Sequence, residues 1–443
     1  MKKKAGLRRE FDLLIIGSGI AGLSAALTAS DAGLQVAVVT KERTISRCNT
    51  EHAQGGIVFR GKRDPELLIE DIINAGSRLN FVDAVRLVAE EGPRAVQEML
   101  VERAGVRFDT DSGGGFDFTQ EAAHSERRII HVKDHTGNAI EESLARTVTA
   151  LPGIEFFPEH CVIELITNSH NSLESEERYR RTRVIGAYVL EERKERVDII
   201  FAPAVLLATG GVGHLFLHTS NTPGATGDGI AMAFRIGAEI INAEFVQFHP
   251  TILYHRDVKR FLITEALRGE GARLMNTRGE YFVERYNPAM KDLAPRDEVS
   301  RAIFYEMERT DSGYVFLDTR LLKKTDLEER FPSIYRQCRE LGIDIAAEPI
   351  PVVPAAHYFC GGIKVDLSGR TNIDGLFAIG ESACTGVHGA NRLASVSLLE
   401  GLVWGIRAAR AAASSLQKIS SRLLSSIPDW VFPAPEEEID PVL

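Results

Sequence analysis

Residues 11–27 read FDLLIIGSGIAGLSAAL, an apolar run followed by a glycine turn and a stretch of small residues. The pattern predicts a buried strand, a tight turn and a helix, and a second strand follows at 36–39. Gly17 permits the sharp turn, Gly19 allows a ligand close to the backbone, and Gly22 lets helix and strand pack together. This order favours a dinucleotide cradle, with pyrophosphate at the helix N-terminus, over an unrelated glycine-rich loop. The cofactor contacts expected in this turn are Gly17, Ser18, Gly19, Ile20, Ala21 and Gly22.

The end of the second strand departs from the usual dinucleotide fingerprint. An acidic residue is expected there, about 20 residues after the glycines, to bind a ribose hydroxyl. Thr40 and Lys41 occupy that place, and Glu42 is the nearest carboxylate. We therefore expect Lys41 to lie at the cofactor.

Length and composition set outer bounds on the function. A chain of 443 residues predicts two or three domains, and a net charge of -10 argues against non-specific nucleic-acid binding. An anionic substrate would then need a local cluster of cations. The five cysteines include no CxxC pair, which favours a reducing compartment. The basic start lacks a following apolar signal region, and no stretch is long and apolar enough to span a membrane. We expect a soluble cytoplasmic protein with no membrane or nucleic-acid partner and no metal centre.

The loop after the second strand, KERTISRCNTEHAQGG at 41–56, gives the first specific resemblance. With the glycine turn, it resembles the family that contains the flavoprotein subunits of succinate dehydrogenase and fumarate reductase together with L-aspartate oxidase. In the membrane-bound members, a histidine just before the loop threonine links covalently to FAD. Here Asn49 precedes Thr50, so the resemblance implies non-covalent FAD. The implied cofactor contacts in this loop are Asn49, Thr50, Glu51, His52, Ala53, Gln54, Gly55 and Gly56.

Three further motifs resemble the FAD-binding parts of these flavoproteins. PAVLLATGG at 203–211 predicts a buried strand with a glycine turn, NTPGATGDG at 221–229 leads into a helix, and GLFAIGE at 375–381 is a strand that ends in an acidic residue. A long helix beginning near Ser397 would direct its N-terminal amides at the flavin, where negative charge gathers on reduction. The cofactor contacts implied by these matches are Asp228, Glu381, Ser397 and Leu398.

The charged loop EAAHSERR at 121–128 is the feature that separates members of the family. Such a loop is most often a solvated surface. L-aspartate oxidases, however, carry an acidic residue in a loop of the form E-small-small-H-S-x-R-R, and Glu121 matches it. The resemblance implies that this carboxylate pairs with a substrate ammonium group, which succinate and fumarate lack.

The block 244–358 resembles the capping domain that closes over the flavin. Taken alone, His249 beside Pro250 and Arg296 beside Asp297 are more often a satisfied histidine and a surface ion pair. The ordered motifs FHPT, ITEALRGEGA, PRDEVSRA, PAAHYFCGG and HGANR instead match positions that bind a dicarboxylate. The implied substrate-site residues are Thr264, Glu265 and the four cations His249, Arg296, His357 and Arg392.

These observations predict an α/β fold, in which a Rossmann-like FAD-binding domain carries an inserted α+β capping domain. We expect the FAD-binding domain at 1–243 and 359–425 and the capping domain at 244–358. Residues 426–443 would be a remnant leading to a C-terminal helical domain that the family's oxidases have and this chain lacks. We also expect a helical scaffold at 64–105. A hairpin with a solvated polar tip is expected at 154–201.

The resemblance implies FAD-dependent oxidation of L-aspartate to iminoaspartate, with oxygen or fumarate as electron acceptor. This is the first step of de novo NAD biosynthesis, which supplies quinolinate synthase. In fumarate reductases the arginine that matches Arg296 delivers a proton to the substrate. The alternatives are a soluble fumarate reductase or succinate dehydrogenase flavoprotein subunit and, from another class, a non-catalytic flavoprotein. Val396 stands where the family usually has asparagine, so one polar contact in that turn is lost or replaced.

Overall fold

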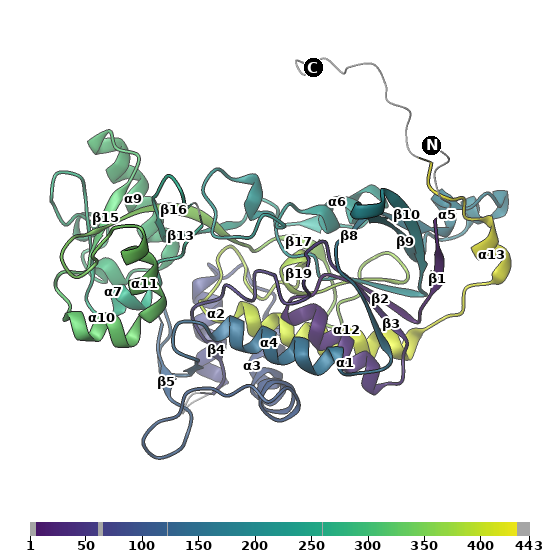
Figure 1. Cartoon of the computed structure of the whole chain (residues 1–443), viewed down its shortest axis with the longest axis horizontal. Helices are drawn as coiled ribbons and strands as arrows, with labels where there is room; N and C mark the ends of the chain where they lie inside the picture. The colour runs from purple at the N-terminus through teal and green to yellow at the C-terminus, as the bar shows by residue number, and fades with distance from the viewer. Residues whose placement is uncertain (1–5, 61–64, 122, 259, 432–443) are drawn as a thin grey trace.

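The computed structural model describes residues 6–60, 65–121, 123–258 and 260–431. Its centre is a parallel five-stranded sheet in the order β18-β11-β2-β3-β7 (Figure 1). The strands are β2 (Leu13–Ile16), β3 (Val36–Val39), β7 (Ile154–Phe157), β11 (Ala204–Leu207) and β18 (Leu376–Ala378). All but β7 are buried throughout. Continuous apolar strands are what a parallel sheet covered on both faces requires.

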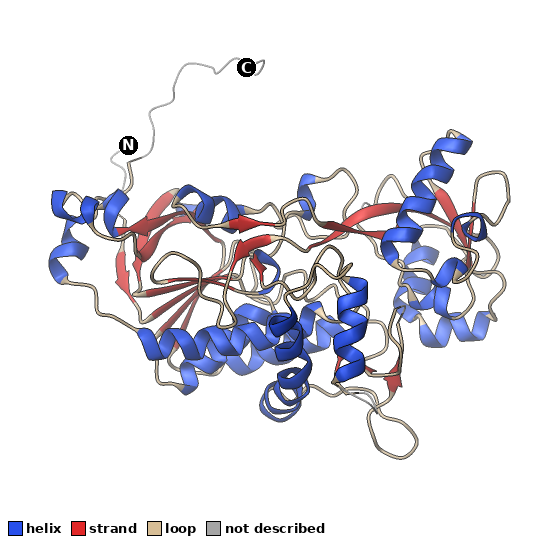
Figure 2. Cartoon of the chain, turned by 180° about the vertical axis from the view of Figure 1, so that it is seen from behind, coloured by secondary structure: helices blue, strands red, loops and turns tan. Residues whose placement is uncertain are grey.

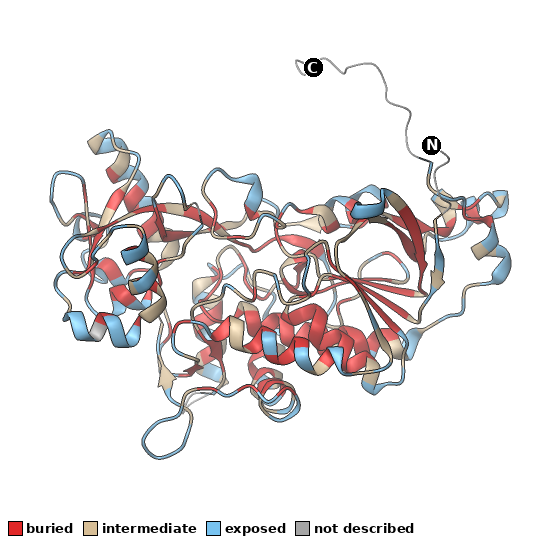
Figure 3. Ribbon diagram, viewed as in Figure 1, coloured by how far each residue is buried: buried red, intermediate tan, exposed pale blue. Residues whose placement is uncertain are grey.

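Helices cover one face of this sheet (Figure 1). They are α1 (Ile20–Asp31), which continues from the glycine turn, α4 (Thr136–Thr149) and α12 (Ser397–Ser415). Small residues allow α1 and α12 to approach closely: a Cβ at Gly405 would lie 2.6 Å from the carbonyl oxygen of Ala21. Figure 3 shows both helices as largely buried, so the helix after the glycine turn is fixed in the core.

A second sheet, in the order β1-β10-β9-β8, covers the other face. Its strands are β1 (Arg8–Glu10), β8 (His160–Thr167), β9 (Val184–Glu191) and β10 (Arg196–Phe201). β8 and β9 form the expected hairpin, but two details of that prediction are wrong. β7 leaves the hairpin and joins the central sheet beside β3. The polar tip is not fully solvated, because Asn168 and Glu177 are buried and hydrogen-bonded to each other at 3.0 Å.

The segment predicted as the capping domain forms its own antiparallel sheet, in the order β13-β16-β15-β14, with its own apolar core. Its strands are β13 (Val246–Leu253), β14 (Arg273–Met275), β15 (Val315–Asp318) and β16 (Ile350–Phe359). Its helices are α7 (Ala266–Gly269), α8 (Val283–Tyr286), α9 (Arg296–Thr310), α10 (Lys324–Arg330) and α11 (Pro332–Glu340). The long strands β13 and β16 join this part to the rest of the molecule (Figure 2). The predicted fold class is confirmed, while the exact domain boundaries stay predictions.

The remaining elements complete the scaffold. The helical prediction for 64–105 is confirmed by α2 (Glu66–Ala75), α3 (Val82–Ala95) and a π-helical segment at Val96–Arg103. Two small three-stranded sheets contain β4 (Ile57–Val58), β5 (Phe118–Thr119), β6 (Ile129–Ile130), β12 (Ile240–Ile241), β17 (Gly362–Lys364) and β19 (Ala383–Cys384). Short helices are α5 (Asn168–Asn171), α6 (Asp228–Arg235) and α13 (Ser421–Ser426). Of the predicted segment 426–443, residues from 432 onward lie outside the described residues. No helix of the described residues has the length and apolar character to cross a bilayer.

Candidate active site and dinucleotide groove

One cavity of about 1070 Å³ extends from the glycine turn to the capping sheet. This volume lies just above the range of about 300–1,000 Å³ typical of ligand sites, which suits a dinucleotide together with a small substrate. Every predicted site residue except Gly22 lines the cavity. A Cβ at Gly22 would lie 2.1 Å from the carbonyl oxygen of Gly17, so Gly22 lies behind the cavity, where helix and strand touch.

The glycine turn leaves the first turn of α1 open toward the cavity. Gly17 has φ = 112°, and a Cβ there would lie 2.1 Å from the carbonyl oxygen of Ala208. Gly19 caps the helix without a side-chain hydrogen bond. The Thr50 hydroxyl accepts a hydrogen bond from the Ile20 amide at 3.1 Å. The first helical hydrogen bond runs from the Leu23 amide to the Gly19 carbonyl at 2.9 Å, so the Ala21 and Gly22 amides precede it and have no acceptor within the helix, which suits an anion at the helix N-terminus.

Several buried polar atoms along this groove have no hydrogen-bond partner among the described residues. They are Ser18 Oγ, Glu51 Oε2, Gln54 Oε1 and Thr209 Oγ1. Buried polar atoms in proteins are almost always hydrogen-bonded. A set of unpartnered atoms along one groove therefore fits a long polar ligand such as a dinucleotide.

The end of β3 shows how the missing acidic residue is replaced. Lys41 Nζ lies 2.6 Å from Asp228 Oδ2 and 3.1 Å from Thr226 Oγ1. Burial raises the pKa of Asp228, but hydrogen bonds from Lys41 and Thr226 outweigh it and hold that pKa below its ordinary value. The ionised carboxylate of Asp228, at the start of α6, thus lies beside Lys41 at the end of β3, where the acidic residue of the usual fingerprint is missing.

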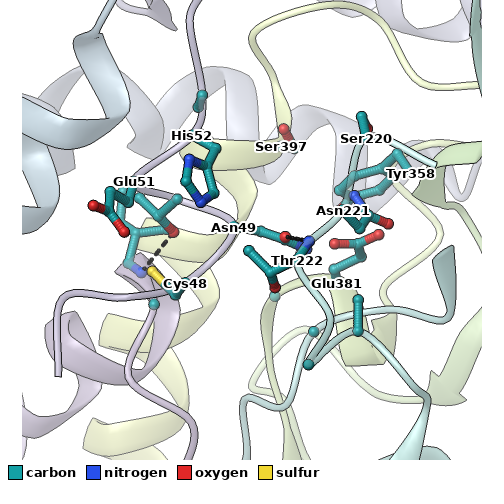
Figure 4. A pocket seen from close by; sticks show the side chains of 18 of the residues that line it. Cys48, Asn49, Glu51, His52, Ser220, Asn221, Thr222, Tyr358, Glu381 and Ser397 are labelled. Carbon is teal, nitrogen blue, oxygen red and sulfur yellow. Dashed lines mark hydrogen bonds between the residues drawn. The ribbon is translucent and has the colours of Figure 1, made fainter. Parts of the chain in front are cut away.

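The middle of the cavity is lined by Asn49 and Glu381 (Figure 4). Asn49 Oδ1 accepts a hydrogen bond from the Thr222 amide at 2.8 Å, and an asparagine has no ring nitrogen for a covalent link to flavin. Glu381 accepts a hydrogen bond from the Phe359 amide at 2.9 Å. Burial raises the pKa of Glu381 to about 7. Near neutral pH, the Glu381 carboxyl group is therefore partly protonated and partly ionised.

Two histidines mark the end of the cavity at the capping sheet. The rings of His249 on β13 and His357 on β16 lie 5.2 Å apart, centroid to centroid. His249 Nδ1 accepts a hydrogen bond from the Thr251 amide at 3.2 Å, and Nε2 has no partner among the described residues. Burial and nearby arginines hold the pKa of both histidines well below the ordinary value. His249 is thus neutral, with an Nε2–H available to a ligand.

Two arginines converge on the same end. Arg392 donates to Gln247 Oε1 at 3.2 Å and to Ser397 Oγ at 3.1 Å, and its guanidinium lies 4.9 Å above the ring of Tyr358. Burial and neighbouring Arg296 lower the pKa of Arg392 to about 10, so it keeps its charge at neutral pH. Arg296, at the start of α9, donates through Nε to Glu265 at 2.6 Å, and its buried Nη1 has no partner among the described residues.

Carboxylates flank these cations. Glu265 pairs with Arg296 and lies 3.5 Å from Arg268; burial raises the pKa of Glu265, but the two arginines outweigh it and lower that pKa overall. Glu121 accepts a hydrogen bond from Ser395 Oγ at 2.8 Å. Burial dominates for Glu121, and its pKa is raised. The site thus combines convergent positive charge with the Glu121 carboxylate, which, unlike Glu265, has no hydrogen bond to an arginine among the described residues.

Comparison with known proteins matches this geometry. The profile of the FAD binding domain family matches residues 12–398. The L-aspartate oxidase of Pseudomonas aeruginosa is 45% identical over 431 residues, which cover 95% of this chain and 78% of that protein. The L-aspartate oxidase of Clostridium perfringens is 44% identical, with 91% of this chain and 87% of that protein covered. The chain belongs to the L-aspartate oxidase family. The expected FAD cofactor is therefore confirmed.

Among solved structures, fumarate reductases have a fold similar to that of this chain. The quinol fumarate reductase of E. coli superposes with a TM-score of 0.86 at 30% identity, over 95% of this chain and 73% of that chain. A flavocytochrome c3 fumarate reductase gives a TM-score of 0.70 at 25% identity, over 92% of this chain and 78% of that chain. Both likenesses extend over the FAD-binding part and the capping part.

The sequence analysis did not identify the residues that hydrogen-bond the charged side chains of the site and hold them in place. Ser220 Oγ lies 2.6 Å from His357 Nδ1, and Gln247 bonds Arg392. Ser395, in the left-handed region at φ = 58°, bonds Glu121 and accepts a hydrogen bond from the Gly56 amide at 3.3 Å. Arg268, which lies within ITEALRGEGA, is 3.5 Å from Glu265. Val396 is fully buried in the apolar core, and the polar contacts of its turn come from the serines on either side.

Proposed function

We propose that this chain oxidises L-aspartate to iminoaspartate with bound FAD, and that oxygen or fumarate takes up the electrons. The observation that carries the proposal is the arrangement at the capping end of the cavity. Two arginines and two histidines converge there, with the carboxylate of Glu121 among the lining residues. Such a site is complementary to a dicarboxylate that also bears an ammonium group.

The cations orient the substrate. Arg296 and Arg392 offer charged donors to the two substrate carboxylates, and His249 offers a neutral Nε2–H. Each charge-assisted hydrogen bond contributes about 1.5–3 kcal/mol, so a few of them together fix the substrate carbon skeleton. Glu121 in its ionised form pairs with the ammonium group and sets which face and which carbon are presented for oxidation.

FAD, when bound, supplies the acceptor for the electron pair and hydrogen that leave the substrate. In the direction of fumarate reduction, the substrate carbon needs a proton. Arg296 lies closest to Glu265, which in turn lies near Arg268, and this chain of groups can resupply a proton that Arg296 gives up. The guanidinium itself hardly deprotonates in isolation, so the adjoining carboxylate is essential to that role.

A soluble fumarate reductase or a succinate dehydrogenase subunit is the second candidate, favoured by the structural likeness to fumarate reductases. Two features weigh against it. Asn49 cannot carry the covalent flavin of the membrane-bound members, and Glu121 would repel a substrate that has carboxylates alone, whether the alternative protein is membrane-bound or soluble.

Anaerobic reduction of the FAD-loaded protein tests the proposal. L-aspartate and succinate are added to separate samples, and the visible flavin absorbance is followed. Bleaching by L-aspartate alone supports the oxidase. Bleaching by succinate alone moves the protein to the dehydrogenase group, and no bleaching by either contradicts both assignments.

We also propose that the product feeds quinolinate synthase in de novo NAD biosynthesis, within a reducing compartment such as the cytoplasm. All five cysteines of the chain are free, which supports the choice of compartment. Mixing the protein with quinolinate synthase and its second substrate, and measuring quinolinate, tests the coupling.

A further inference from the structure

The loop that carries Glu121 has almost no regular structure, yet two of its polar side chains, His124 and Arg128, are buried. It follows the two-residue strand β5 and precedes β6. Ala123, two residues after Glu121, adopts a left-handed conformation at φ = 65°, which is unfavourable for a residue with a Cβ. Such a conformation persists only where surrounding contacts impose it.

The first of these contacts comes from helix α2. The buried carboxylate of Asp71 accepts hydrogen bonds from the Ser125 amide at 2.8 Å, from the Ser125 hydroxyl at 2.5 Å and from Arg128 Nη1 at 2.6 Å. Arg128 is fully buried, and the exposed fraction of Asp71 is 6%. Three donors on one helix-borne carboxylate fix the second half of the loop.

The second contact joins the loop to the turn before α12. Burial lowers the pKa of His124 to about 4, so its ring is neutral at physiological pH. Its Nε2 lies 3.0 Å from the carbonyl oxygen of Ala394, which can only accept, so Nε2 carries the hydrogen. The next residue, Ser395, bonds Glu121. The loop and the turn therefore hold the Glu121 carboxylate between them.

We propose that Asp71 is a positioning residue, which sets the Glu121 carboxylate for the substrate ammonium group through Ser125 and Arg128. Asp71 does not line the cavity and acts through the loop alone. The inference rests on the proposed function, because Asp71 is inferred to position Glu121, and Glu121 is the proposed partner of the ammonium group that L-aspartate has and succinate lacks.

Asp71→Asn tests the idea. An asparagine keeps the shape, and its amide nitrogen can donate to the Ser125 hydroxyl, but the change removes the negative charge that pairs with fully buried Arg128, so we expect the loop to shift. A displacement of about 1 Å in a positioning group can cost up to about 100-fold. We expect KM for L-aspartate to rise at least about tenfold. The dissociation constant of succinate, read from its perturbation of the flavin spectrum, should change by less than about twofold, because among the described residues no hydrogen bond joins this loop to the two arginines or the two histidines.

Asp109→Asn is the matched control. The carboxylate of Asp109 accepts a hydrogen bond from the Lys133 amide at 2.8 Å and lies 3.3 Å from His131, so it anchors the chain just beyond the loop without touching 121–128. Neither ligand should be affected by this change. Ser125→Ala removes one of the three bonds, keeps the ion pair, and gives a smaller shift of the same kind if Asp71→Asn does not fold.

The double variant Asp71→Asn with Glu121→Gln decides whether Asp71 acts through Glu121. We expect the Asp71 change to add nothing once Glu121 is neutral, since positioning an amide gains no ion pair. Equal weakening of L-aspartate and succinate, no change in either, or additive effects in the double variant would each overturn the inference. Failure of the unaltered protein to oxidise L-aspartate would instead refute the proposed function, so the two failures are distinct.

Discussion

Arg296→Lys tests the substrate site most directly. Arg296 uses Nε for Glu265, which leaves the terminal nitrogens of the guanidinium for a substrate carboxylate. A lysine keeps the positive charge beside Glu265, but its single ammonium cannot form the same two-point contact. Because Glu265 also lies 3.5 Å from Arg268, the buried carboxylate keeps a partner and the protein is expected to fold.

The magnitude follows from the contacts that are lost. Two charge-assisted hydrogen bonds of about 1.5–3 kcal/mol each amount to about 3–6 kcal/mol. With a factor of ten for each 1.36 kcal/mol, the rate constant for reduction at limiting L-aspartate should fall by about 10²- to 10⁴-fold. Flavin content should not change, because Arg296 lies at the capping end of the cavity.

The assay is stopped-flow bleaching of the flavin under anaerobic conditions, with the ratio of visible to ultraviolet absorbance as the measure of bound FAD. Arg301→Lys is the control on the same helix, since Arg301 is an exposed residue paired with Asp297 at 2.8 Å. An R296K variant that is reduced as fast as the R301K control, at equal flavin content, would refute the assignment of Arg296 to the substrate.

Three further predictions concern single groups. Because burial raises the pKa of Glu121, its ionised form is lost as pH falls through that pKa; KM for L-aspartate should rise on acidification, and Glu121→Gln should remove this dependence in a pH series. Gly17→Ala should destabilise the protein by about 1–3 kcal/mol and release FAD, because the new Cβ meets the Ala208 carbonyl at 2.1 Å; denaturant titration and flavin retention on gel filtration measure both. The Arg320 guanidinium lowers the pKa of Asp318 to about 2 from an ordinary 3.8. The resulting stabilisation of up to about 2 kcal/mol is present above pH 4 and lost as pH falls toward 2; acid titration of Asp318→Asn should lack this loss.

Local rules account for the parts of this structure that sequence predicted well. The glycine turn must contain glycine at position 17, since φ is positive and the neighbouring carbonyl leaves no room for a Cβ. A short continuous apolar run such as 36–39 can only be a buried strand or a buried helix segment, and its length decides for the strand. Motifs of this kind are visible because each residue is constrained by its immediate neighbours in the chain.

Partners far apart in the sequence were not predictable by the same reasoning. β7 pairs with β3 across more than a hundred residues, and nothing in its composition distinguishes the central sheet from the hairpin next to it. The tip at 168–177 reads as solvated because its residues are polar, yet Asn168 and Glu177 satisfy each other and are buried. Asp71 gave no signal either, since an acidic residue in a helix is most often exposed.

Strand β16 explains how a site built from two parts of the molecule keeps its geometry. His357, near the end of β16, faces the capping end of the cavity, and two residues later the Phe359 amide holds Glu381 in the flavin-binding part. Between them, Tyr358 lies under Arg392 and donates to Glu400 of α12 at 2.9 Å. A single extended segment thus links His357, Arg392 and Glu381, and a displacement of the capping sheet would move β16 along with all three contacts. His357 and Glu381 are therefore fixed relative to each other by one strand, whereas Glu121 is held by a separate loop. On the role that we propose for Glu121, we expect substitutions in that loop to change substrate selectivity while His357 and Glu381 keep their positions.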